Sequence, residues 1–117
     1  MGKRNEQGIL PGTADLLILK AVSEGPAHGF GISRVLKERS EGVVDFQDAA
    51  LYQALHRMAR QGWVESEWGV SDRGRRAKFY QLTPQGVKRL AREESDFRTY
   101  VEGVFRILAF DSGSAPR

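Results

Sequence analysis

The spacing of the apolar residues changes twice along this chain of 117 residues, and this change constrains the fold more than any other feature. Up to Gly62 the apolar side chains recur with the helical period of about 3.6, whereas from Trp63 to Leu82 they alternate with the period of 2 that strands show. After Thr83-Pro84, an N-cap followed by proline at the first helical position, the helical period returns and reaches about Phe110. The sequence therefore predicts a mainly α fold of the α+β class: three helices, a small β-hairpin and a long C-terminal helix.

The first two predicted helices form the inner part of this fold. Thr13 is a candidate N-cap for a helix that is apolar nearly all round over residues 16–22 and that ends at Gly25-Pro26. This helix should be central and buried. The second helix opens at residues 28–31, His-Gly-Phe-Gly, is amphipathic, and fades into the loop Ser40-Glu41-Gly42.

The third predicted helix has two contrasting faces. Asp48 is its expected N-cap, it runs to about Arg60, and Gly62 ends it at the C′ position. One face holds the apolar residues Leu51, Ala54, Leu55 and Met58. The other face is small, aromatic and cationic, with Ala49, Tyr52, Gln53, His56, Arg57 and Arg60.

A basic hairpin follows. The predicted strands are residues 63–68 and 78–82, with Gly69 and Gly74 in the connection, and Gly74 permits the positive φ of a tight turn. The cations gather at this tip: Arg73, Arg75, Arg76 and Lys78. Because like charges repel, such a cluster indicates an anionic partner. The hairpin aromatics, Trp63, Trp68, Phe79 and Tyr80, should pack it onto the helices.

The last helix, residues 84–110, carries a stripe with 3-4 spacing. Its members are Val87, Leu90, Glu94, Phe97, Val101, Val104 and Leu108. A helix this long exceeds what so small a core can cover, so the stripe predicts a homodimer formed through a partner helix. The alternative is that the helix folds back along its own domain. Residues 111–117 are predicted to be a disordered tail.

Composition limits the remaining possibilities. The net charge is +3 and the pI about 9.5, but nine lysines and arginines face only three acids between residues 49 and 92. There is no cysteine, the longest apolar run is residues 16–19, and the first eight residues lack the apolar stretch of a signal peptide. These features predict a cytoplasmic, non-secreted protein without a membrane span.

No catalytic pattern is present. The sequence lacks G-x-S-x-G, H-E-x-x-H and a P-loop, and its two histidines lie in separate predicted helices without acids at ligand spacing. We expect no enzyme activity, no metal and no cofactor.

Three helices with a polar, cationic third helix, followed by a basic hairpin, is the order of a winged helix-turn-helix. In that architecture the third helix enters the major groove of double-stranded DNA and the hairpin tip lies on the neighbouring backbone. The sequence thus predicts a DNA-binding domain over residues 1–83.

The sequence also resembles the PadR-type transcriptional regulators from about Leu10 to Leu90. The resemblance lies in LPGTADLLILKAVSEGPAHGFGI, in LYQALHRMARQGWVESEWGVS, and in RRAKFYQLTPQGVKRL. It implies a homodimeric, cytoplasmic DNA-binding regulator, usually a repressor, that a small-molecule effector often releases from DNA. The single C-terminal helix is similar to that of the family's smaller subclass.

The resemblance carries DNA contacts onto Tyr52, onto Arg57 in an L-x-R segment, and onto the wing cations Arg76 and Lys78. Three positions depart from the family pattern. Gln53 stands where proline is common, Ala50 where Ser or Thr is common, and Phe30 where tyrosine is common. Since glutamine can read adenine bidentately, the operator should differ from the family's usual one.

Several alternatives stay open. Tyr52 and Gln53 could form a solvated face, Arg57 and Arg60 could pair with nearby acids, and His56 could be an ordinary surface residue. A winged helix can also bind protein or RNA without reading DNA sequence. Four cations at the wing tip argue against a protein partner, and Tyr52 is the one aromatic residue predicted to be exposed, which argues against single-stranded RNA.

Overall fold

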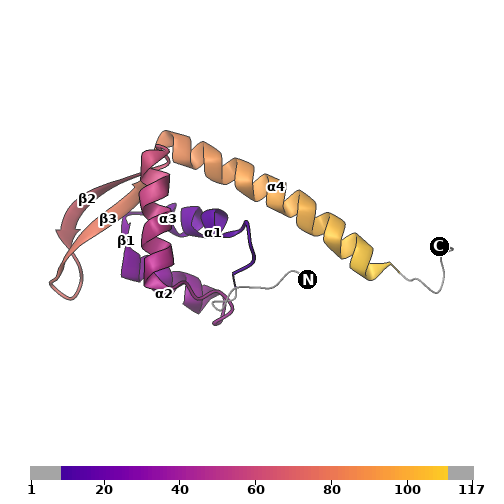
Figure 1. Ribbon diagram of the computed structural model, residues 1–117, viewed down its shortest axis with the longest axis horizontal. Helices are drawn as coiled ribbons and strands as arrows, with labels where there is room; N and C mark the ends of the chain where they lie inside the picture. The colour runs from indigo at the N-terminus through magenta and orange to yellow at the C-terminus, as the bar shows by residue number, and fades with distance from the viewer. Residues whose placement is uncertain (1–8, 111–117) are drawn as a thin grey trace.

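The three predicted helices are present in the computed structural model, which describes residues 9–110 (Figure 1). They are α1 (Ala14–Val22), α2 (Gly29–Arg39) and α3 (Asp48–Arg60). The tail predicted at residues 111–117 lies outside the described part of the chain. No helix within residues 9–110 combines the length and the apolar character that crossing a membrane requires.

A three-stranded antiparallel sheet joins the hairpin to the helices. Its strands are β1 (Ala27–His28), β2 (Val64–Val70) and β3 (Arg76–Leu82), in the order β1-β3-β2. The hairpin strands are longer than predicted, and Gly69 lies within β2 opposite Ala77 instead of in the connection. A Cβ on Gly69 would lie 2.9 Å from the Phe79 ring, so glycine leaves room for this ring beside the strand.

The long helix α4 (Pro84–Ala109) begins where predicted. The Thr83 hydroxyl accepts a hydrogen bond from the backbone N–H of Gly86 (3.0 Å) and donates one to the carbonyl of Gly62 (2.5 Å). These two bonds cap α4 and tie it to the end of α3. Figure 1 shows α4 running past α1 and reaching beyond the other helices, at the opposite end of the molecule from the hairpin tip.

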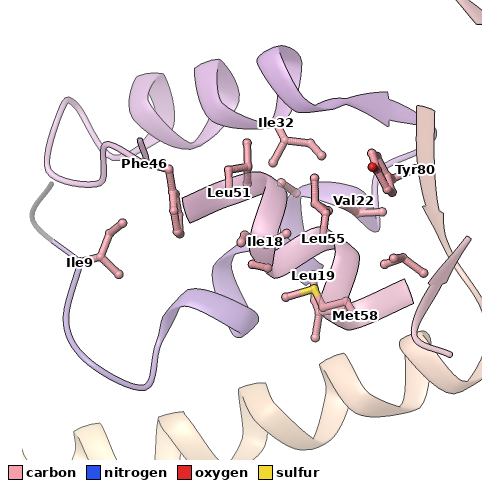
Figure 2. Close-up of a cluster of buried hydrophobic side chains, with 13 residues drawn as sticks. Ile9, Ile18, Leu19, Val22, Ile32, Phe46, Leu51, Leu55, Met58 and Tyr80 are labelled. Atoms are coloured by element: carbon pink, nitrogen blue, oxygen red, sulfur yellow. The ribbon is translucent and has the colours of Figure 1, made fainter. Parts of the chain in front are cut away.

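One apolar core lies between the three short helices and the sheet (Figure 2). Its fully buried side chains are Ile18, Leu19, Val22, Ile32, Leu51, Leu55, Met58 and Tyr80. The 3.6-residue spacing brings those of each helix onto one side. Val64 of β2 and Tyr80 of β3 are buried in this core and cover its side next to the sheet, so the hairpin is part of the domain.

The helix ends differ in part from the prediction. Thr13 lies at the N-cap position of α1, but its hydroxyl donates to the Leu10 carbonyl and caps no N–H. Asp48 is the first residue of α3 and Gln47 its N-cap, so the predicted cap was wrong by one residue. An acid in the first turn still faces the positive end of the helix dipole. The C′ position of Gly62 is confirmed, with φ of +81°.

Candidate nucleic-acid interface

The outer face of α3 is built as the sequence predicts. Its apolar residues are buried in the core, whereas Ala49, Tyr52, Gln53, His56 and Arg60 are exposed on the opposite side. Because the helix is fixed along its whole buried side, these polar side chains stand on a rigid element.

Two surface grooves flank α3. A cleft of about 650 Å³ separates it from the hairpin and is lined by Tyr52 and His56 from the helix. A second groove, of about 570 Å³, runs along the other side and is lined by Gln53, Arg57 and Arg60. His56 lines both, which places it in the middle of the outer face.

Tyr52 leans toward the start of α2. A Cβ built on Gly29 would lie 2.5 Å from the Tyr52 ring and hydroxyl, so glycine leaves room for the ring in this position. Tyr52 keeps 41% of its surface exposed. Burial raises the pKa of the neighbouring Tyr80 hydroxyl, and the nearby Tyr52 adds to this shift. Part of the Tyr52 side chain therefore supports the domain, and the rest faces the cleft.

The hairpin tip presents its cations to the same cleft. The backbone N–H of Ser71 donates to the Arg75 carbonyl (2.7 Å), that of Gly74 donates to the Ser71 carbonyl (2.9 Å), and Gly74 has φ of +75°. This turn exposes Arg73, Arg75, Arg76 and Lys78, and all four line the cleft. The predicted positive φ at Gly74 is confirmed.

Exposed aromatic rings lie beside three of these four cations. The Arg76 guanidinium carbon lies 4.4 Å from the centroid of the Trp68 ring, and the Lys78 ammonium nitrogen 5.7 Å from it. Arg73 lies 5.9 Å from the centroid of the Phe30 ring, which Arg34 also approaches. Cation–π attraction of this kind restricts where the charges point.

Two predictions about aromatic residues are corrected here. Trp68 was expected to pack the hairpin onto the helices, but it is 56% exposed and lies beside the wing cations. Tyr52 is not the only exposed aromatic residue, because Phe30 and Trp68 beside the cleft and Phe97, Tyr100, Phe105 and Phe110 on α4 or at its end are exposed as well. Cations lie over the rings of Phe30 and Trp68, so these two beside the cleft are not free platforms for stacking bases.

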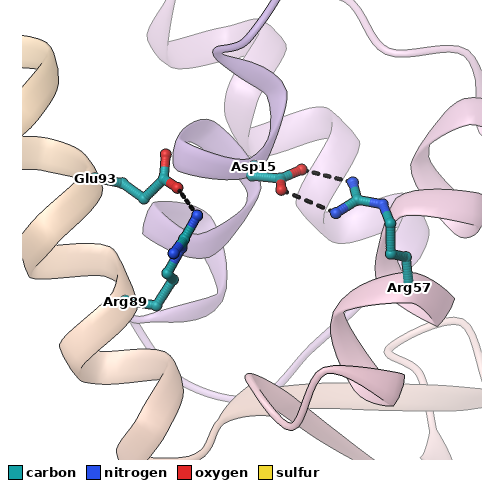
Figure 3. A network of polar contacts seen from close by, with 4 residues as sticks. All are labelled: Asp15, Arg57, Arg89 and Glu93. Atoms are coloured by element: carbon teal, nitrogen blue, oxygen red, sulfur yellow. Dashed lines mark hydrogen bonds and ion pairs between the residues drawn. The ribbon is translucent and has the colours of Figure 1, made fainter.

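Arg57 is engaged by an acid from another helix. Its two terminal nitrogens donate to the two carboxylate oxygens of Asp15, at 2.9 and 2.7 Å (Figure 3). The hydrogen bonds to Asp15 raise the pKa of the Arg57 guanidinium, and partial burial opposes this shift. The acid pairing that the sequence left open is therefore present, and DNA contact by Arg57 stays a prediction.

The residues predicted for the dimer seam lie along α4. Val87 and Leu108 are exposed, as is part of Phe97, whereas Val101 and Val104 are half-buried. Leu90 packs against the core of its own chain. Glu94 accepts two hydrogen bonds from Arg98 of the same helix (2.8 and 3.1 Å), which lower the pKa of the Glu94 carboxyl.

Two further features of this region were not predicted. His28, expected as a packing residue at the start of α2, contacts the Phe79 ring edge-on and also caps α2 by accepting a hydrogen bond at Nδ1 from the backbone N–H of Gly31 (3.1 Å). Asp15 carried no sequence signal, because its partner lies 42 residues away. Within residues 9–110, no three His, Cys, Asp or Glu side chains gather as metal ligands would.

Comparison with known proteins places the chain among transcriptional regulators. The sequence model of the transcriptional regulator PadR-like family matches residues 18–92. An uncharacterized protein from Lysinibacillus sphaericus is 28% identical over 98 residues, which cover 80% of this chain and 89% of that protein.

Solved structures agree with this match. The crystal structure of a PadR family transcription regulator from Clostridium difficile has a TM-score of 0.73 and 27% identity, covering 84% of this chain and 100% of that one. A PadR-like transcriptional regulator from Bacillus cereus has a TM-score of 0.74 and 22% identity, covering 86% and 95%. The second likeness concerns the fold alone.

Proposed function

Because the chain belongs to the PadR-like family of transcriptional regulators, we propose that it is a cytoplasmic, homodimeric repressor of a near-palindromic operator. The two α3 helices would enter successive major grooves, about one helical turn apart, and the wings would lie on the flanking phosphates. Residues 1–83 are the proposed DNA-binding domain and residues 84–110 the dimerisation helix.

One observation carries this proposal: Tyr52 and His56 on the polar face of α3 border the same cleft as the four wing cations. A helix with such a face fits the width of the major groove, and cations beside it meet the phosphates of the adjoining backbone. Each neutralised phosphate releases counterions, so binding should weaken steeply as salt rises.

The proposed contacts divide into two kinds. Residues on the outer face of α3 would contact base edges, and among them Gln53 has the amide geometry for adenine. The cations, which outnumber the other proposed contact residues, would contact phosphates. The complete proposed set is Ala49, Tyr52, Gln53, His56, Arg57, Arg60, Arg73, Arg75, Arg76 and Lys78.

Exposed apolar side chains on α4 support the proposed dimer. Leu108 is 71% exposed and Val87 57% exposed, and the neighbouring Phe105 and Ile107 are also exposed. So many apolar residues on one helix are typical of an interface between chains. The proposed seam is Val87, Leu90, Glu94, Phe97, Val101, Val104 and Leu108.

The proposal includes release of the repressor by a small molecule, as in other members of the family. Two shallow grooves, of about 390 and 430 Å³, lie between α4 and the first helix with its preceding loop, and both are lined by Leu16 and Phe97. A ligand there would contact the proposed dimer helix and the DNA-binding domain at once.

The first experiment is fluorescence anisotropy of a labelled mixed-sequence duplex titrated with the protein at several salt concentrations, together with the mass of the free protein. We expect a dimer and a steep negative slope of log affinity against log salt. Absence of binding at low salt would contradict the DNA-binding role and favour a protein or RNA partner.

Two variants test the division of contacts. Arg76→Ala should weaken binding to all duplexes and reduce the salt slope by about one, because one phosphate contact is lost. Gln53→Ala should instead change the preference at one base position, by about 1–3 kcal/mol. Equal losses on operator and mixed-sequence DNA for both variants would refute the division.

A further inference from the structure

The contact between Asp15 and Arg57 ties the DNA-facing helix to the first helix. Asp15 lies in the first turn of α1, and each of its carboxylate oxygens accepts one hydrogen bond from Arg57 (Figure 3). Within residues 9–110 this is the only ion pair between α3 and another helix. A bidentate pair fixes the plane of a guanidinium as well as its position.

The pair leaves Arg57 able to bind a second partner. A guanidinium has five N–H donors, and Asp15 uses two of them. The Arg57 side chain is 42% exposed and lines the groove along α3 together with Gln53 and Arg60. The free donors are therefore presented beside the residues that we assign to DNA.

We propose that Asp15 is a positioning residue for Arg57. It lowers the affinity of the protein for DNA of any sequence and increases its discrimination between sequences. This inference rests on the proposed function, in which the outer face of α3 contacts DNA. The charge of Asp15 weakens the attraction of Arg57 for any phosphate, whatever the sequence. Its two hydrogen bonds hold the guanidinium in one orientation, so only a duplex that places an acceptor there gains the full contact.

These two effects have opposite signs, which makes them separable. Removing the charge should leave binding to mixed-sequence DNA unchanged or up to about fivefold tighter. Releasing the guanidinium should weaken binding to the preferred sequence, because its orientation must then be fixed on binding. If the pair were purely structural, its loss would leave the ratio of the affinities for preferred and mixed-sequence DNA unchanged.

The test uses the full chain and two duplexes: the one that wild-type protein enriches from a random pool, and a mixed-sequence duplex of equal length. Asp15→Asn keeps the size of the side chain and removes its charge. We expect the ratio of the two affinities to fall about 3- to 10-fold. Arg57→Lys, which retains the charge but lacks the planar fork, should lower the ratio in the same way.

Two controls assign the effect to the pair. Glu24→Gln makes the same change in net charge and breaks the exposed ion pair with Arg39, so it should leave the ratio unchanged. In an Arg57→Ala background, Asp15→Asn should have no further effect on the ratio, as a double-mutant cycle requires.

An unchanged ratio in folded, dimeric Asp15→Asn would overturn the inference while leaving the proposed function intact. An equal fall in the Arg57→Ala background would also overturn it, since Asp15 would then act through another residue. If wild-type protein binds neither duplex, the proposed function fails first and the role of Asp15 fails with it.

Discussion

At the scale of single residues, the wing depends on an aromatic ring that faces solvent. Trp68 lies opposite Lys78 in the register of β2 and β3, and Arg76 is the next residue of β3 on the same face. Both cations therefore approach one ring from neighbouring positions. In the proposed complex, the ring would reduce the number of orientations that the two side chains give up on meeting phosphates.

Replacing Trp68 by alanine should weaken binding to every duplex by about 3- to 10-fold, because two cation–π contacts are lost. The salt slope should stay nearly unchanged, since no charge is removed. Trp68→Phe should recover part of the affinity. Anisotropy titrations measure the affinities of both variants and the salt slope. A slope reduced as in Arg76→Ala would contradict this prediction, because it would show that a phosphate contact is lost with the ring.

Trp68 and Asp15 were not predicted from the sequence because their partners are set by tertiary structure. Trp68 was expected to pack the hairpin onto the helices, and its actual position follows from the strand register and its cations. Asp15 was a helix-start acid like many others until α3 placed Arg57 beside it. The face of α3 was predictable because a helix has a fixed period.

At the scale of elements, periodicity predicted every element long enough to show it. The four helices and the hairpin meet this condition, whereas β1 has two residues and no period. Helix α1 holds the arrangement together: Asp15 contacts α3, whereas Leu16 and Leu17 line the groove against α4. The helix that we propose faces DNA and the proposed dimer helix are thus both held against one short, buried helix, α1.

The junction between the hairpin and α4 should tolerate no side chain at Gly86. A Cβ there would lie 2.0 Å from the Trp63 carbonyl oxygen, so Gly86→Ala must move α4 or β2. We expect a loss of about 1–3 kcal/mol in the free energy of unfolding, measured in urea. Gly103→Ala is the matched control in the same helix.

A Cβ on Gly103 would meet only Arg106, at 3.9 Å. Gly103→Ala should therefore stabilise the protein by about 0.5–1 kcal/mol, the usual gain for alanine within a helix. If both variants were equally stable, the close approach at Gly86 would have no energetic consequence.

At the scale of the whole molecule, the described chain leaves a large apolar surface along α4. The molecule measures 62 Å along its longest axis and 28 Å and 22 Å along the others, because the end of α4 extends away from the other elements of residues 9–110. Such a helix end would be costly in water as a monomer. A second copy would cover it and would bring two DNA-binding domains into a fixed relation.

Two adjacent residues near the end of α4 test the proposed seam. Leu108 belongs to the predicted stripe and Ile107 lies about 100° away from it, yet both are similarly exposed, at 71% and 74%. Leu108→Asp should raise the dimer dissociation constant at least about tenfold, because a charge would be buried in the seam. Ile107→Asp should raise it much less.

Sedimentation equilibrium measures both dissociation constants. A larger effect for Ile107→Asp would mean that the dimer uses another face of α4.

The pairing of β1 with β3 has a consequence for the order in which the chain folds. Ala27 lies opposite Tyr80, and Tyr80 belongs to the core formed by the three short helices. The helices are made of local contacts and can form early, but one side of their core stays uncovered until Tyr80, more than 50 residues downstream of its strand partner Ala27, packs against it. During synthesis, the N-terminal helices must therefore wait, with apolar surface uncovered, until β3 has left the ribosome.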